Sequence, residues 1–170
     1  MATWVPVTPR IGLQALTETS TTQNLPLGTI AMWQDTDTSG QGVGEFIYLL
    51  GVVGTVVGHM VTYNTTTFQT AVSTNTANAV NPIAVAMSAN VASQYGWYQI
   101  SGYTIVKKTA VIVLPGVALF QSGTTGRVMS TVASGKQLLG MRSANLATVA
   151  SATSTVAAML DRPGKQGQVI

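Results

Sequence analysis

The 170-residue chain contains no cysteine, so it can form no disulfide framework, no thiolate nucleophile and no cysteine-based metal site. Charge is also scarce: 8% of the residues are charged, against about 25% in an ordinary soluble domain. The net charge of +3 comes from eight Lys and Arg residues that are scattered along the chain. Nucleic-acid-binding domains usually gather such residues on one face. The sequence therefore predicts no direct nucleic-acid partner, and a polar surface made mainly by its 25 Thr and 12 Ser residues.

Long apolar runs are absent as well. The longest uncharged apolar run, Phe46 to Val61, is shorter than the roughly 20 residues that a membrane-spanning helix needs. It is rich in valine and contains three glycines, which favours two buried strands joined at a glycine. The first ten residues lack a basic start followed by an apolar run, so no signal peptide is expected. We expect no membrane partner.

Groups that could carry out catalysis are few and far apart. His59 is the only histidine, and it lies in an apolar segment. The five acidic residues are scattered rather than paired, whereas a triad or a carboxylate pair needs its groups placed together. The glycine clusters GQGVGE and SGTTGRV lack the spacing and the following helix of phosphate-binding loops. We therefore expect no catalytic residues, no cofactor and no enzymatic activity.

One acidic turn resembles the start of a calcium loop. Asp35, Asp37 and Ser39 occupy the first, third and fifth positions, and Gly40 the sixth. The twelfth position, which should hold a bidentate glutamate, is Phe46. A polar β-turn explains the segment better, because Asp and Ser hydrogen-bond to nearby backbone. We expect no metal site.

From residue 28 onward the sequence is typical of β-structure. Short Val- and Thr-rich runs alternate with turn residues such as Ser-Gly and Pro-Gly. At most one short helical turn is expected, in residues 143–155. The expected fold is all-β, an antiparallel β-sandwich or barrel (jelly-roll-like). The expected strands are GTIAMWQ, EFIYLL, TVVGHMVTY, IAVAMSA, GWYQIS, YTIVK, AVIVL, VALFQ, GRVMSTV, QLLGMRS and STVAAML.

The ends of the chain differ from this body. We divide the chain into an extended N-terminal arm (1–27), a β-sandwich or barrel domain (28–163) and a C-terminal tail (164–170). Prolines interrupt the arm, and a polar run fills its middle. Trp4 either folds back on its own domain or docks on a neighbouring subunit. On the second alternative, the partner-binding residues are Trp4, Pro6, Pro9 and Arg10.

Aromatic residues make up only 6% of the chain, yet four of them fall between Tyr95 and Tyr103. Strand alternation places Tyr95 and Trp97 on one face, and Tyr98 on the other. A stacking site for bases would interleave basic or polar groups, and this stretch has no charged residue. We therefore interpret Tyr95, Trp97 and Tyr98 as core aromatics of a central strand.

The order of GEFIYLLGV, AVAMSANVASQYGWYQISG, VLPGVALFQSGTTGRV and AAMLDRP resembles the capsid decoration, or cement, proteins of tailed bacteriophages. The resemblance extends from about Gly28 to Pro163. Its most specific part is the small-residue strand from Ala84 to Ala89 leading into Gly96–Ile100. The resemblance implies a β-sandwich or barrel that binds the outside of an icosahedral shell, often as an oligomer and through a terminal arm. It implies no enzymatic activity and no cofactor.

The expected function is therefore that of a structural virion protein that bridges capsid subunits, with its arm as a main clasp. The expected partners are the major capsid protein and other copies of this chain, as a dimer or trimer. The expected location is the outer surface of the capsid, after synthesis in the host cytoplasm. The alternative is a phage tail or head-fibre component that binds a host surface.

Overall fold

The computed structural model describes residues 3–8, 13–37, 40–89 and 92–168, and within these ranges it contains strands and no helix. All strand pairs are antiparallel, which confirms the expected all-β class. The strands belong to one sheet that does not close into a barrel. They are β1 (Trp4–Pro6), β2 (Ile30–Asp35), β3 (Val43–Leu50), β4 (Met60–Tyr63), β5 (Thr70–Val72), β6 (Ile83–Ala86), β7 (Tyr95–Lys107), β8 (Ala118–Gln121), β9 (Val128–Met129), β10 (Gln137–Ser143) and β11 (Thr155–Lys165).

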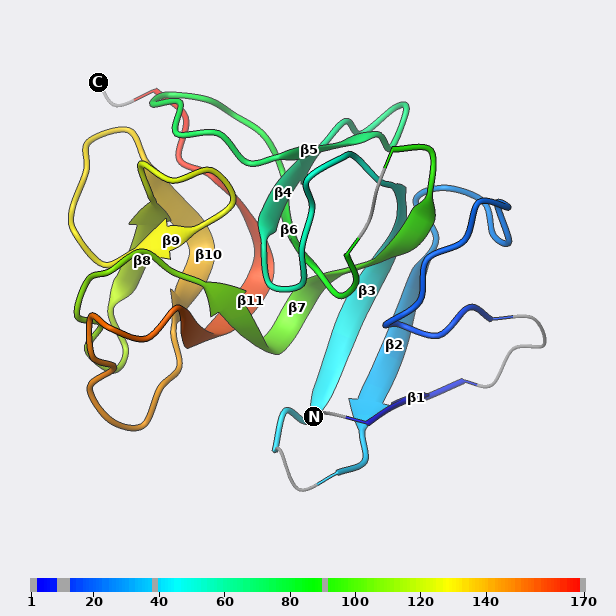
Figure 1. The fold of residues 1–170 in the computed structure, drawn as a ribbon, viewed down its shortest axis with the longest axis horizontal. Helices are drawn as coiled ribbons and strands as arrows, with labels where there is room; N and C mark the ends of the chain where they lie inside the picture. Colours follow the sequence, from blue (N-terminus) through cyan, green and yellow to red (C-terminus); the bar gives the residue numbers. More distant parts are fainter. Residues whose placement is uncertain (1–2, 9–12, 38–39, 90–91, 169–170) are drawn as a thin grey trace.

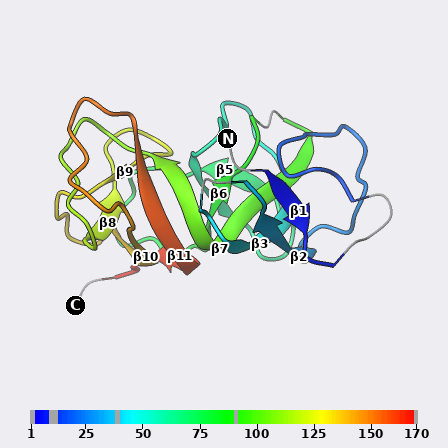
Figure 2. The ribbon, with the colours of Figure 1, turned by 90° about the horizontal axis from the view of Figure 1, so that it is seen from below.

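The sheet is organised around β7, its longest strand with 13 residues. The first half of β7 pairs with β3, and the second half pairs with β11. β6 pairs with β7 at Tyr98 and Gln99, and β4 and β5 follow β6. Figures 1 and 2 show the consequence: β1 to β6 lie around one end of β7, and β8 to β11 lie around the other.

Two local features bend β7 between its halves. Phe46 pairs with Gln99 while Glu45 pairs with Ser101, so one extra residue of β7 forms a β-bulge, which increases the local bend and twist of a strand. Gly102 follows with φ of +96°, and a Cβ there would lie 2.6 Å from the carbonyl oxygen of Val43. Only glycine fits this conformation and this close approach. The bend allows one continuous strand to serve two differently oriented parts of the sheet.

Neighbouring side chains of β7 enter different parts of the core. Trp97 is fully buried against Trp33, Phe46 and Tyr48 on one face of the sheet. Tyr98 is fully buried on the other face, among residues of β3, β4 and β6. A third cluster, which includes Val106, Leu138 and Val156, lies among β8 to β11 and extends to residues of β4 and β6. The strand thus joins three apolar clusters.

The described part of the N-terminal segment belongs to the folded body. β1 pairs with β2, and Leu16, which is 2% exposed, packs on the Trp97 side of the sheet. Gln14 ties this segment to the core through both its backbone and its side chain. Its carbonyl accepts a hydrogen bond from Trp97 Nε1 at 2.9 Å, and its Oε1 accepts one from the Tyr48 hydroxyl at 2.9 Å. Residues 13–27 therefore form a cover over the aromatic core rather than a detached arm.

Several strands differ from their expected form. The segments GWYQIS and YTIVK were expected as two strands, and they form the single bent strand β7. Residues 110–114 were expected as a strand, and they contribute only an isolated bridge from Val113 to Val149. β5 lies in a Thr/Asn-rich stretch where no strand was expected. Residues 143–155 contain no helical turn.

Replacement of Trp97 by Ala should destabilise the fold by about 3–5 kcal/mol, because it removes a fully buried indole from a close-packed cluster. Trp97→Phe should cost less, since it keeps an aromatic ring and loses mainly the hydrogen bond to Gln14. Urea unfolding of the three proteins measures both differences. Identical unfolding midpoints for the parent and Trp97→Ala would contradict the assignment of Trp97 to the core.

Candidate functional site

The residues that the sequence suggested for partner binding lie in and around β1. Trp4 is half-buried, and its ring packs edge-on against Phe46 at a centroid distance of 5.1 Å. Pro6 is half-buried opposite Trp33. Pro9 and Arg10 lie outside the described residues. Within this chain, Trp4 therefore folds back on its own domain, which is the first of the two alternatives given above.

The three aromatic residues of β7 differ in exposure. Trp97 and Tyr98 are fully buried, whereas Tyr95 is half-buried and stacks on Tyr48 with the two rings 15° apart. Burial raises the pKa of Tyr48 above its ordinary value of 10.0. The hydroxyl therefore remains protonated at neutral pH and donates to Gln14. Trp97 and Tyr98 thus belong to the core of the fold, and Tyr95 packs at the margin of the Trp97 cluster.

The outer side of β1 and β2 carries a row of exposed apolar side chains. Direct partners in an antiparallel pair project to the same face, and the register pairs Val5 with Gln34 and Gln34 with Val43. Val7 lies beside Met32, to whose carbonyl its backbone amide donates. We call this surface the β1–β3 face. Its apolar members, each 43–49% exposed, are Val5, Val7, Ile30, Met32 and Val43.

The β1–β3 face is continuous with the buried core. Ile30 pairs with Ile47, which is 4% exposed and belongs to the Tyr98 cluster. β4, β5 and β6 lie over that cluster, while the outer part of the same sheet side, on β1 and β2, stays exposed. Polar groups interrupt the apolar residues of this face: Gln34 lies between Val5 and Val43. Glu45, which forms an ion pair with Arg162, lies opposite Met32. Exposed apolar side chains gathered on one face often mark sites of protein interaction. Sequence reasoning missed this face, because it depends on the pairing of three strands.

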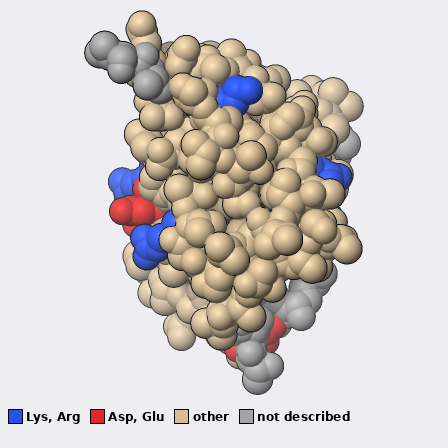
Figure 3. All heavy atoms as spheres, turned by 90° about the vertical axis from the view of Figure 1, so that its left-hand side faces the viewer, with Lys and Arg blue, Asp and Glu red and all other residues tan. Residues whose placement is uncertain are grey.

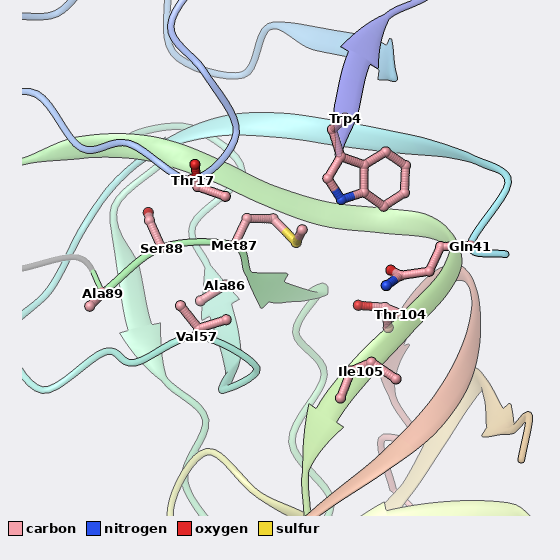
Figure 4. A pocket seen from close by; sticks show the side chains of 10 residues that line it. All are labelled: Trp4, Thr17, Gln41, Val57, Ala86, Met87, Ser88, Ala89, Thr104 and Ile105. Atoms are coloured by element: carbon pink, nitrogen blue, oxygen red, sulfur yellow. The ribbon is translucent and has the colours of Figure 1, made fainter. Parts of the chain in front are cut away.

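A pocket of about 560 Å³ opens on another part of the surface. Figure 4 shows Trp4 of β1, Met87 after β6, and Thr104 and Ile105 of β7 around it, with the Met87 side chain extending toward Trp4. Val57 from the β3–β4 connection also lines it. None of the lining residues can carry a charge at neutral pH. The lining residues of this pocket therefore offer no acid or base for catalysis.

His59, the only histidine, is half-buried beside β4. No protein group bonds to its buried Nδ1 within the described ranges. Burial lowers the pKa of His59 below 6.5, and the charges of Arg127 and Lys107 lower it further, against a hydrogen bond with the Gly54 backbone. Gly126 lies so close that a Cβ there would be 2.9 Å from the imidazole ring. His59 is therefore a neutral packed residue, and the charged groups that act on its pKa are the cations Arg127 and Lys107.

Asp35 organises the acidic turn through backbone hydrogen bonds. One carboxylate oxygen accepts from the amides of Thr3 and Asp37, and the other accepts from the amide of Gln41. The side chain is 8% exposed, so it depends on these donors. Backbone amides thus occupy the oxygens that a calcium ion would require. Over the described ranges, no group of three or more His, Asp or Glu residues could hold a metal ion.

Two buried lysines, Lys108 and Lys165, donate hydrogen bonds to backbone carbonyls. Lys108 is fully buried, and its ammonium group donates to the carbonyls of Thr109, Val111 and Ser151. Burial lowers its pKa. Lys165 donates to the carbonyl of Thr74, and burial lowers its pKa as well. Both residues hold loop backbone in place, and neither lines the pocket.

Asp35→Asn should lower stability and leave calcium binding unchanged, because the carboxylate serves backbone amides rather than a metal ion. Calorimetric titration of the parent with calcium should show no saturable heat. A micromolar calcium site that disappears in Asp35→Asn would contradict this prediction.

Acid should destabilise the parent through His59. The pKa in the folded state is below the ordinary value of 6.5, so the unfolded state binds more protons between these two values. The stability contribution is complete above pH 6.5 and is lost as the pH falls toward the folded-state pKa. Thermal melting at pH 7.5 and at mildly acidic pH should therefore show a larger loss for the parent than for His59→Asn. An equal loss of melting temperature in both proteins would show that His59 does not contribute to the acid sensitivity.

No helix within the described ranges is long and apolar enough to cross a bilayer. Neither a protein-family model nor a curated protein matches this chain. The resemblance to phage cement proteins accordingly rests on the residues quoted for it.

Proposed function

We propose that this protein is a structural virion protein that binds the outside of an icosahedral phage capsid and stabilises it by bridging capsid subunits. Its partner is the major capsid protein, and it acts without a cofactor or catalysis. The observation that carries the proposal is the β1–β3 face, an exposed apolar surface on the N-terminal strands. The resemblance of residues 28–163 to cement proteins supplies the identity of the partner.

The face has the features of a contact surface. Five large apolar side chains lie on one face of the paired strands, with Gln34 and Glu45 among them, and each apolar side chain is close to half exposed. β2 and β3 are paired on both sides and so lose little further conformational freedom on docking, so burial of their part of the face would contribute directly to affinity. The face includes Val5 and Val7 from the segment that the sequence analysis assigned to clasping. The capsid-binding clasp proposed here is therefore the β1–β3 face of the folded sheet, and not a free N-terminal arm.

The rest of the surface is poorly suited to an isolated monomer. Only 8% of the residues are charged, and few Lys, Arg, Asp or Glu side chains interrupt the surface in Figure 3. Charged groups normally keep soluble proteins apart. A permanent subunit of a large assembly does not need that protection. The low content of charged residues thus favours a protein that is a permanent subunit of a particle.

The proposed activity needs no chemistry beyond binding. A protein that binds only the assembled shell shifts the assembly equilibrium by mass action, by about 2.7 kcal/mol per site at a hundredfold excess over Kd. If each copy contacts two subunits, the second contact forms at high effective concentration. Many such sites on one shell would raise its resistance to heat.

The test uses empty phage shells reconstituted with purified protein and then heated. The parent should bind in many copies per shell, as mass measurement of the particles would show, and should raise their melting temperature. The double variant Val5→Lys/Val43→Lys places charges on one row of the β1–β3 face, at two side chains that are each 45% exposed. It should fold as the parent does and protect the shells less.

A matched control carries Lys at Val53 and Val132, which are 70% and 80% exposed and lie outside that face. This control should protect the shells as the parent does. Equal protection by all three proteins would remove the β1–β3 face as the contact. Failure of the parent itself to bind shells would overturn the proposed function. Substitutions are preferable to deletion of residues 1–22, because deletion would remove Gln14 and Leu16 from the aromatic core.

A further inference from the structure

The pocket beside Trp4 has features that the shell-binding proposal does not use. Its volume of about 560 Å³ falls in the range of roughly 300–1,000 Å³ that is usual for small-molecule sites. Most of its lining is apolar, and its polar members are Thr17, Gln41, Ser88 and Thr104. A charged ligand would lose its hydration there without meeting an opposite charge, which is costly. The lining therefore selects for an uncharged ligand.

Ser88 adds a polar group that has no partner. Its side chain is 3% exposed and lines the pocket beside Met87. No described group forms a hydrogen bond with its buried Oγ. Buried hydroxyl groups normally have a hydrogen-bond partner, and an orphan is unfavourable. The Ser88 hydroxyl therefore keeps unused hydrogen-bonding capacity beside an apolar pocket.

We propose that this pocket binds a small, uncharged and mainly apolar molecule that forms one hydrogen bond with Ser88 Oγ. The apolar body of the ligand would lie among Trp4, Met87 and Ile105. Its single polar atom would meet Ser88 Oγ once the Ser88 side chain rotates toward the pocket, because that atom is buried in the absence of a ligand. The pocket shares no lining residue with the apolar members of the β1–β3 face, which are Val5, Val7, Ile30, Met32 and Val43.

Two related probes test the chemistry. N-phenyl-1-naphthylamine is neutral, and its N–H can donate to Ser88 Oγ. 8-Anilino-1-naphthalenesulfonate has the same aromatic body with one added negative charge. Fluorescence titration of the intact chain should show saturable binding of the neutral probe and at least tenfold weaker binding of the charged probe at the same site. Equal affinity for the two probes at this site would overturn the selection for an uncharged ligand.

Variants locate the site. Ile105→Trp enlarges a wall side chain that is 41% exposed and should abolish binding of the neutral probe without unfolding the chain. Ile112→Trp introduces the same change at a residue that is 58% exposed and does not line the pocket, and it should bind as the parent does. Melting curves of both variants verify folding.

Ser88→Ala removes only the hydroxyl group and should weaken binding of the neutral probe about three- to tenfold, as expected for one hydrogen bond. Unchanged affinity in Ser88→Ala would overturn the role of Ser88. Full binding in folded Ile105→Trp, or no saturable binding of the neutral probe by the parent, would overturn the site itself.

Discussion

The structure depends on one strand that serves two parts of the sheet. β7 pairs with β3 before its bend and with β11 after it, and the bend requires Gly102. Adjacent side chains at Trp97 and Tyr98 then fill clusters on opposite faces. Because the two faces share this backbone, a change in its register would disturb both clusters at once. The aromatic cluster in the sequence is therefore explained by architecture and not by a ligand.

Hydrogen bonds to backbone fix the parts of the chain that the sheet does not reach. Gln14 Nε2 donates to the carbonyls of Glu18 and Tyr95, in addition to the bonds that Gln14 accepts from Tyr48 and Trp97. Lys108 does the same for two loops near β8 to β11. Polar groups are costly to bury unless they are paired. Gln14 and Lys108 thus hold loop backbone in place through hydrogen bonds inside the fold.

The sequence was sufficient for the all-β class and for strands with strong local patterns, such as β3 and β10. It was insufficient where pairing decides the outcome. The Ser-Gly pair at 101–102 signals a turn, yet β11 keeps β7 continuous through it. Residues 110–114 have high β-propensity but pair only at Val113. The cover formed by residues 13–27, the β1–β3 face and the pocket all depend on contacts between distant segments, which local patterns do not specify.

The N-terminal strands connect the core to the surface. On β1, Trp4 points inward against Phe46 while Val5 and Val7 lie on the outer face. β1 pairs with β2 over only three residues, and short edge strands open more easily than central ones. A partner on the outer face would hold β1 in place and so keep Trp4 on Phe46 and in the pocket wall. On the proposed function, binding at that face would therefore be coupled to order at the aromatic core, because a partner that stabilises the pairing of β1 with β2 would favour both.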